Sequence, residues 1–312
     1  MSAVPSLSGL EELRRGLSPR SSLPEAARVL LCLQARRLEE SFPAALAGEE
    51  PAPLHDSRVA GRRLRAGVAM FQCMYPGAWK KAEGWARCAT SRFRLARDLD
   101  IRCARLRRMM VAAGGYSQEE LGLIGGLLED SVVERKESRG PAVPPVGGNG
   151  GRMLLVLWRP RSSRAPEAER FVRVRFRELE QGASLLIPVA CEERRGGVQH
   201  RLRMRCRALR YSLEMMEWRL GDQAAWRLEI LRSVQDELGE LHDIDVFRGY
   251  IMERAGHPVR PLPKNDGAPK AHRGFEGLGD IGSGLGEERH RLFERFLDIR
   301  EGLERALAPL NL

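Results

Sequence analysis

The sequence has few aromatic residues and lacks long apolar runs. Phe, Trp and Tyr together make up 6% of its 312 residues, which argues against an all-β protein because aromatic and β-branched residues are enriched in strands. It has no stretch of about 18 apolar residues, so no membrane span is expected. The N-terminal region lacks the apolar core of a signal peptide, which favours a cytoplasmic protein.

Cysteine pairs and the common catalytic signatures are also missing. The six cysteines include no CxxC pair, and in a reducing compartment they are expected to act as small apolar residues rather than zinc ligands or disulfides. The sequence has no GxSxG motif, no P-loop and no glycine-rich dinucleotide fingerprint. We therefore predict a protein that is not an enzyme and uses no metal and no cofactor.

Positive charge is abundant. Lys and Arg total 52 against 42 Asp and Glu, which gives a formal net charge of +10 and a sequence pI near 9.8. This excess favours a polyanionic partner such as nucleic acid, polyphosphate or an anionic membrane surface. Arg outnumbers Lys 47 to 5. Arg suits bidentate phosphate binding, but a GC-rich genome gives the same excess of Arg over Lys. Only the placement of the arginines can therefore indicate an anion-binding function.

Apolar residues recur at three- and four-residue spacing, which is typical of helices. We predict helices over 24–47, 54–74, 79–111, 117–137, 166–186, 198–220, 223–254 and 287–308, with a further helical turn near 153–158. Segments 140–151 and 256–286 are rich in Gly and Pro and are expected to be a linker and a mobile loop. The predicted fold is all-α, with two four-helix bundles.

The predicted boundaries follow from these segments. They are an N-terminal extension (1–24), a first bundle (25–139), a linker (140–151) and a second bundle (152–312).

The two predicted bundles share an internal repeat. When the sequence is shifted by 145 positions, residues 55–100 match residues 200–245 at nine of 46 positions without gaps, and seven of the nine are charged residues or His. A duplication under structural constraint alone should mainly keep apolar positions. The matched polar residues therefore point to a shared task.

On a helical wheel, His55, Arg58, Arg62 and Arg65 form a cationic stripe about 100° from the apolar face, and His200, Arg203, Arg207 and Arg210 repeat it. The following helix carries a second stripe, composed of Arg87, Arg94, Arg97, Arg105 and Arg108. In the second copy this stripe is weaker: Arg232 replaces Arg87, His242 replaces Arg97 and Gly239 replaces Arg94.

Like charges at this spacing repel one another, so either neighbouring acids or an external anion must offset them. The internal candidates are Asp98 and Asp243, which we expect to pair with a stripe arginine or to cap a helix. A solvated helix face and an internal lattice of ion pairs are the structural alternatives to an anion site.

Two motifs carry a family resemblance. LHDSRVAGRRLRAGVAMF (54–71) with ARDLDI (96–101), and QHRLRMRCRALRYSLEMM (199–216) with LGELHDIDVF (238–247), resemble the two halves of a CHAD domain, the conserved histidine α-helical domain. The resemblance covers about residues 25–308. It implies two pseudo-symmetric bundles around a basic central groove, binding of inorganic polyphosphate, and a cytoplasmic protein that can gather on polyphosphate granules. The ExExK motif of the fused triphosphate-tunnel domain is absent, so that activity is not expected.

Residue by residue, the resemblance assigns polyphosphate binding to His55, Arg58, Arg62, Arg65, His200, Arg203, Arg207 and Arg210. The additional candidates are Arg63, Arg87, Arg97, Arg105, Arg232 and Tyr211. Two positions depart from expectation: Ser57 stands where the family usually has Leu, and Gly61 interrupts the helix at a cost of roughly 1 kcal/mol relative to Ala.

The sequence thus predicts non-enzymatic binding of polyphosphate. The alternative is a nucleic-acid-binding protein that uses the same charge. Aromatic residues do not alternate with the stripes, which argues against single-stranded nucleic acid.

Overall fold

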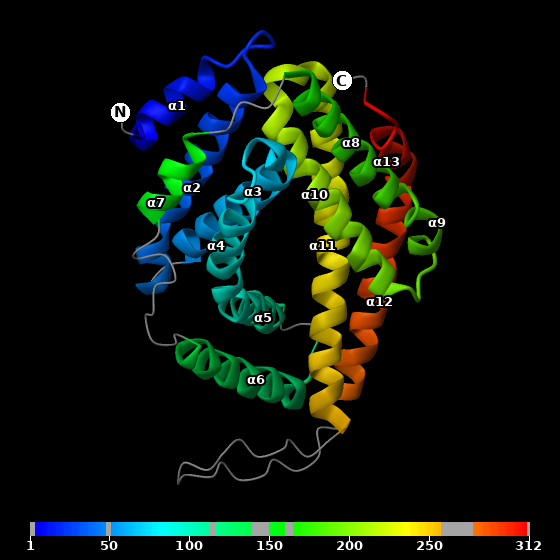
Figure 1. Ribbon diagram of the computed structural model, residues 1–312. Helices are drawn as coiled ribbons and strands as arrows, with labels where there is room; N and C mark the ends of the chain where they lie inside the picture. Colours follow the sequence, from blue (N-terminus) through cyan, green and yellow to red (C-terminus); the bar gives the residue numbers. More distant parts are fainter. Residues whose placement is uncertain are drawn as a thin grey trace.

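The computed structural model describes residues 4–47, 51–112, 116–138, 150–159, 165–256 and 277–310. All regular structure in these ranges is helical, which confirms the predicted all-α class. The elements of the first half are α1 (Leu7–Arg15), α2 (Leu23–Ala47), α3 (Pro51–Met70), the 3-10 helix η1 (Gln72–Met74), α4 (Trp79–Arg92), α5 (Arg94–Val111), α6 (Gln118–Glu137) and α7 (Gly150–Leu157). The elements of the second half are α8 (Ala165–Ser184), α9 (Ile187–Ala190), α10 (Gly196–Leu220), α11 (Asp222–Gly256), α12 (Gly277–Asp298) and α13 (Arg300–Ala306). Figure 1 shows the two halves side by side, with α3 next to α10.

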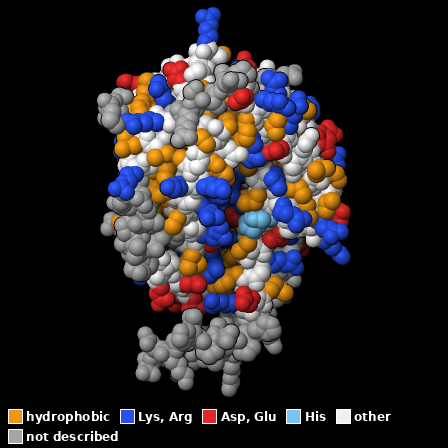
Figure 2. Space-filling view, viewed as in Figure 1, with side chains coloured by type: hydrophobic (Ala, Val, Ile, Leu, Met, Phe, Trp, Pro, Cys, Tyr) orange, Lys and Arg blue, Asp and Glu red, His pale blue; other side chains and the backbone are white. Residues whose placement is uncertain are grey.

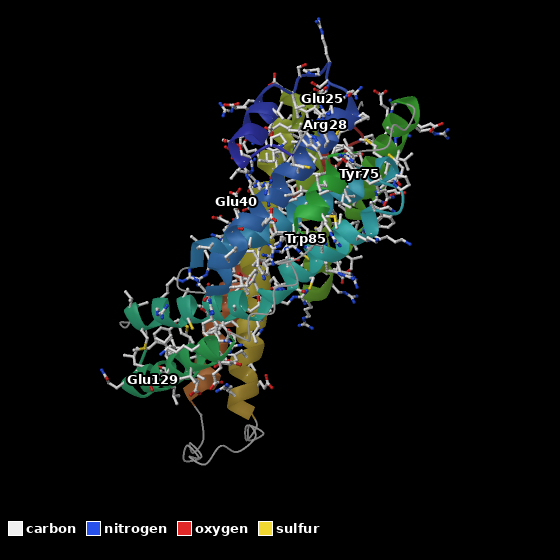
Figure 3. All side chains as sticks on the ribbon, turned by 60° about the vertical axis from the view of Figure 1, so that its left-hand side comes forward. Glu25, Arg28, Glu40, Tyr75, Trp85 and Glu129 are labelled. Atoms are coloured by element: carbon white, nitrogen blue, oxygen red, sulfur yellow. The ribbon has the colours of Figure 1, made fainter. Side chains whose placement is uncertain are left out.

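The apolar centre of the first half is α2, which is buried along most of its length. It contacts α1, α3 and α7. The Tyr75 hydroxyl donates to the Leu157 carbonyl at 2.8 Å, which ties α7 to this half. The predicted boundary between residues 151 and 152 therefore falls inside a helix that packs on the first half. In Figure 3, Arg28 of α2 and Glu129 of α6 mark opposite ends of the molecule.

The two departures noted in α3 have packing explanations. A Cβ at Gly61 would lie 2.4 Å from Thr90 Cγ2, so glycine allows α3 and α4 to approach closely. Ser57 is fully buried, and its hydroxyl lies 2.7 Å from that of Ser41 on α2. A hydroxyl pair thus takes the place of an apolar contact, and its hydrogen bond satisfies the buried hydroxyl of Ser57.

The second half is built from α10, α11 and α12, with α8 against α10. A tight turn at Gly221, where φ is +50°, joins α10 to α11, and glycine adopts this conformation without the steric cost of a Cβ. The Arg227 guanidinium donates to the carbonyls of Ala306 and Ala308 at 3.3 and 2.8 Å. These bonds fix the C-terminal segment to α11.

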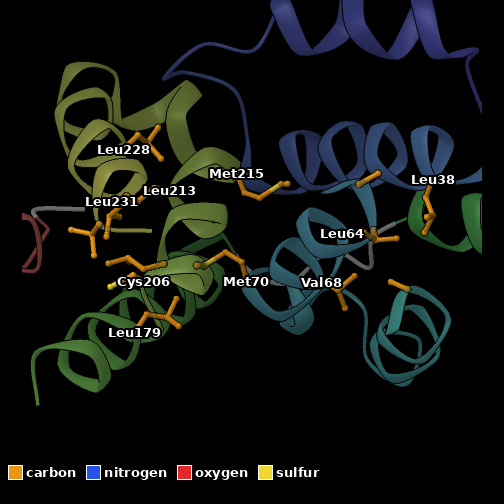
Figure 4. Packing of buried hydrophobic residues seen from close by; sticks show 14 of the residues in the cluster. Leu38, Leu64, Val68, Met70, Leu179, Cys206, Leu213, Met215, Leu228 and Leu231 are labelled. Carbon is orange, nitrogen blue, oxygen red and sulfur yellow. The ribbon is translucent and has the colours of Figure 1, made fainter. Parts of the chain in front are cut away.

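Two of the contacts between the halves lie at or beside the arginine-bearing helices. At the proximal contact, α3 packs on α10 through Met70 and Met215 (Figure 4), and Arg63 Nε donates to Glu214 at 2.6 Å. A Cβ at Gly67 would lie 3.2 Å from the Met215 sulfur, so the two helices are close.

The distal contact joins α5 and α6 to α11 and α12. The Arg102 guanidinium carbon lies 3.9 Å from the Tyr250 ring centroid, Arg254 donates to Asp130 at 3.0 Å, and Arg105 pairs with Glu288. This contact combines the polar interactions with buried apolar residues of α6 and α12, among them Ile124, Leu127, Ile281 and Leu285, which belong to the hydrophobic core. Methionine packing contributes to the proximal contact.

The helix predicted over 79–111 is wrong in one respect, because it breaks at Phe93. Phe93 is buried against Phe42, with ring centroids 5.2 Å apart, and its backbone turns at φ −94°, ψ 10°. Arg87 therefore lies on α4, while Arg94, Arg97, Arg105 and Arg108 lie on α5. The second stripe is not one continuous row.

The loop predicted over 256–286 is also wrong in part. Residues 277–286 belong to α12, because Ile281 and Leu285 are buried one turn apart and tertiary packing outweighs the low helix propensity of the glycines between them. Residues 257–276, and 140–149 of the predicted linker, lie outside the described residues. The N-terminal extension contains α1, whose Leu10 is fully buried.

Candidate functional site

The central feature of the site is a group of four arginines, Arg58 and Arg62 from α3 and Arg203 and Arg207 from α10, called here the arginine cluster. On each helix the two residues are four apart, so they lie on one face. Arg62 lies close enough to both Arg203 and Arg207 to lower their pKa. Packing of α3 on α10 thus brings the two predicted pairs together across the halves.

The cluster is electrostatically strained. Burial, followed by the charge of Arg62, lowers the pKa of Arg207 to about 9. Burial and the same neighbour lower the pKa of Arg58 to about 10. The guanidiniums therefore keep their charge at neutral pH but raise one another's free energy. An anion placed among them would relieve this repulsion.

Carboxylates do not neutralise the cluster directly. Among the described side chains, none of its four arginines has an Asp or Glu oxygen within 4.0 Å. The nearby acidic residues include Asp98 of α5 and Asp243 of α11. Their charges oppose the lowering of the pKa of Arg58 and Arg203 respectively, which burial mainly causes. The cluster is therefore not an internal lattice of ion pairs.

The expectation that Asp98 and Asp243 pair directly or cap a helix is wrong. Both lie within helices rather than at helix ends, and in the described part of the chain neither makes an ion pair within 4.0 Å. Burial raises the pKa of Asp243, although Arg203 and Arg97 act in the opposite direction. The two carboxylates therefore lie near the cluster without direct ion pairing.

The histidines of the two predicted stripes differ. His200 is partly buried, and Arg203 and Arg207 help to lower its pKa after burial and His242. The ring of His242, on α11, lies 4.1 Å from that of His200 between centroids. His55 is exposed and makes no hydrogen bond or ion pair to a described residue. The sequence repeat identified His242 only as the counterpart of Arg97, so its contact with His200 was missed.

Three other predicted arginines already have carboxylate partners. Arg65 Nη2 lies 3.8 Å from Glu83. One carboxylate oxygen of Glu214 lies 2.6 Å from Arg63 Nε, and the other lies 3.7 Å from Arg210 Nη1. Tyr211 is buried, with the Arg210 guanidinium carbon 4.6 Å from its ring centroid. The spacing of Arg210 and Glu214, i and i+4, was a signal in the sequence for this pair.

The remaining candidates are spread over several helices. Arg97 lies near Asp243 and lowers the pKa of that carboxyl. Arg105 is engaged by Glu288 and lies 5.2 Å from the Phe247 ring. Arg87 and Arg232 are exposed, and no ion pair or cation–π contact in the described ranges joins them to the cluster.

Figure 2 shows Lys and Arg side chains gathered along the middle of the face viewed in Figure 1, with His beside them. Within the described residues, no group of three or more His, Cys, Asp or Glu could hold a metal ion. No helix in those same ranges is long and apolar enough to cross a membrane. All six cysteines are free. Burial was expected for all of them and is found for Cys32, Cys103 and Cys206, whereas Cys73 and Cys191 are partly buried and Cys88 is exposed.

Comparison with known proteins gives one family and two similar structures. The family model described as CHAD domain matches residues 29–251. The crystal structure of the CHAD domain from the plant Ricinus communis is similar at 18% identity over 95% of this chain and 94% of that one, with a TM-score of 0.59. PptA from Streptomyces chartreusis is similar at 15% identity over 92% and 99%, with a TM-score of 0.63. No curated protein sequence matches the chain. At these identities the two structures support the fold.

Proposed function

The chain belongs to the CHAD domain family, and from that premise we propose that it binds inorganic polyphosphate through the arginine cluster without catalysing a reaction. The association of this family with polyphosphate supports the class of ligand. The observation that carries the proposal is the cluster itself: two arginines from each half, partly buried and without a carboxylate within 4.0 Å among the described residues.

The chemistry of the cluster suits a linear polyanion. Each guanidinium presents a planar set of donors that can bind two phosphate oxygens at once. Neutralising several phosphates also releases condensed counterions, so binding should weaken steeply with salt. Burial and then repulsion lower the pKa of Arg58 and Arg207, and the repulsion decreases when phosphate charge enters.

The other assigned residues contribute less in this proposal. Arg65 and Arg210 must exchange Glu83 and Glu214 for phosphate, so their net gain is smaller. His55 begins the stripe on α3 and is exposed, so only a chain that extends beyond the cluster would contact it. The remaining candidates, Arg63, Arg87, Arg97, Arg105, Arg232 and Tyr211, lie outside the core of the proposed site.

The decisive experiment removes the cluster. We expect the variant R58A/R62A/R203A/R207A to stay folded by circular dichroism and to lose at least 100-fold in affinity for long-chain polyphosphate. The slope of log affinity against log salt should fall by about three, since each lost phosphate contact removes roughly 0.7. Equal affinity in a folded variant would show that the site is assigned wrongly.

A matched control separates site from total charge. The variant R15A/R170A/R194A/R291A removes the same four charges from exposed positions that make no described ion pair. We expect this variant to keep most of the affinity. If both variants lose affinity equally, general charge rather than the cluster explains binding.

Competition tests the nucleic-acid alternative. Excess duplex DNA or RNA should fail to displace bound polyphosphate, and displacement at equal phosphate concentration would favour nucleic acid.

A phosphate-release assay with Mg²⁺ or Mn²⁺ tests whether the protein binds polyphosphate without hydrolysing it, and steady release of phosphate would contradict this part of the proposal. A fluorescent fusion tests whether the protein is cytoplasmic and gathers on polyphosphate granules.

A further inference from the structure

Two histidines from neighbouring helices stack beside the arginine cluster. The rings of His200 on α10 and His242 on α11 lie 4.1 Å apart between centroids, with 36° between their planes. His200 precedes Arg203 by one helical turn and Arg207 by two, so it lies on their side of α10. His200 Nδ1 is buried and has no described hydrogen-bond partner. The pair therefore lies beside the arginine cluster and includes a buried nitrogen without a described hydrogen-bond partner.

Charged groups from several helices lie around the pair, including Arg289 of α12, whose Nε donates to Asp245 at 2.6 Å. The facing groups are Arg203 and Arg207 on α10, Asp243 and Asp245 on α11, Asp98 on α5, and Arg62 on α3 next to the two α10 arginines. Burial and then the neighbouring cationic groups lower the pKa of His200 below its usual 6.5. Burial and Arg203 also lower the pKa of His242, although Asp245 and Asp98 oppose them. Without a ligand, both rings are uncharged at neutral pH.

We infer that His200 and His242 belong to the polyanion site and take up protons when the chain of phosphates binds, so that binding tightens as the pH falls. This inference rests on the proposed function. Phosphate charge beside the rings favours the imidazolium form and cancels the field of the arginines. Each imidazolium then supplies two N–H donors, whereas the neutral ring supplies one.

The direction of the pH dependence follows from linkage. Binding raises the pKa of a ring above its value in the free protein, so proton uptake occurs only between these two values. Affinity is constant above the window, rises as pH falls through it, and levels off below the pKa of the free protein. The slope reaches about tenfold per pH unit for each proton taken up.

The two halves of the site differ in whether they contain a side chain that titrates near neutral pH. The counterpart of His242 in the first half is Arg97, and arginine, unlike histidine, is not a side chain that switches its charge near neutral pH. The second half therefore adds a titratable contact to a site whose four arginines do not titrate near neutral pH.

The experiment measures affinity for long-chain polyphosphate from pH 5.5 to 8.5 at constant ionic strength. Long chains are used because only their terminal groups titrate near neutral pH. We expect wild-type affinity to rise at least tenfold from pH 8 to pH 6. The affinity of the variant H200Q/H242Q, whatever its value at pH 8.5, should change less than threefold over the same pH range. The control H290Q removes an exposed imidazole that contacts Glu193 elsewhere, and it should keep the full pH dependence.

Calorimetry on the wild-type protein gives a second readout that needs no variant. Binding at pH 6.5 in two buffers of different ionisation enthalpy should report net proton uptake. A pH-independent wild-type affinity, zero proton uptake, or an unchanged pH dependence in H200Q/H242Q would each overturn the inference and leave the proposed function standing. Absence of binding at every pH would overturn the proposed function, and with it this inference.

Discussion

Burial and the charge of Arg62 lower the pKa of Arg207 to about 9, so the charge of Arg207 should cost stability. Its pKa is lowered in the folded protein, so the protonated form is penalised at every pH below about 9, and the penalty fades as pH rises through that value. We expect Arg207→Gln to raise the free energy of unfolding at pH 7 by about 0.5 kcal/mol, because like-charge neighbours on helices cost several tenths each.

Urea denaturation at pH 7 measures this change. Arg201→Gln, at an exposed position of the same helix, is the matched control and should leave stability within error. A less stable Arg207→Gln protein would show that the cluster is held by favourable contacts instead of being strained. The same variant should bind polyphosphate more weakly, so function and stability oppose each other at this residue.

At the residue scale, the sequence identified the arginine cluster but not all the partners of the flanking arginines. Arg58, Arg62, Arg203 and Arg207 could be grouped because a helix repeat and an internal duplication both mark them. The pairing of Arg65 with Glu83 depends on how α4 packs on α3, which no local spacing encodes. The stacking of His200 on His242 depends in the same way on the register of α10 against α11.

At the scale of the helices, a substitution at Gly61 tests the close packing of α3 on α4. An added Cβ would lie 2.4 Å from Thr90 Cγ2, so we expect Gly61→Ala to cost about 1–3 kcal/mol through overpacking. The double variant Gly61→Ala/Thr90→Ser should recover most of this loss, because serine lacks the methyl and keeps the hydroxyl that donates to the Ala86 carbonyl.

Thermal or urea unfolding of the single and double variants gives the result. Gly249→Ala on α11, where an added Cβ meets nothing within 4 Å, is the control and should stabilise by up to about 1 kcal/mol. If Gly61→Ala is as stable as Gly249→Ala, the close contact of α3 with α4 is absent.

Helix positions were predictable wherever apolar spacing alone decides them. The break at Phe93 was missed because apolar spacing continues through it, and the turn is accompanied by packing of Phe93 on Phe42 of α2. The start of α12 was missed because its glycines suggest a loop, whereas Ile281 and Leu285 gain burial against the second half. Both errors arise from tertiary contacts that outweigh local preference.

For the whole molecule, the distal contact is expected to be the weaker connection between the halves. The Tyr250 ring lies 3.9 and 4.9 Å from the guanidinium carbons of Arg102 and Arg254, and each such contact is worth about 0.5–1 kcal/mol at an exposed site. We expect Tyr250→Ala to speed amide hydrogen exchange in α5 and α6 about tenfold, while α3 and α10 keep their protection.

Met70→Ala is the comparison variant, since it removes apolar contact at the proximal interface. It should speed exchange in α3 and α10 instead. A higher salt concentration should also speed amide exchange in α5 and α6 of the wild-type protein, because salt screens the ion pairs of the distal contact. Uniform exchange changes across all helices would contradict two separable contacts.

The bridge through Glu214 has a consequence for selectivity. One carboxylate holds Arg63 of α3 and Arg210 of α10, beside the residues that carry the two arginine pairs. Together with the packing of α3 on α10 at Gly67 and Met215, this bridge fixes the spacing between the two arginine pairs. We expect this fixed spacing to make binding sensitive to the cross-section of the polymer. A bare phosphate chain should fit between the two arginine pairs, whereas a chain that carries a sugar on every unit should not.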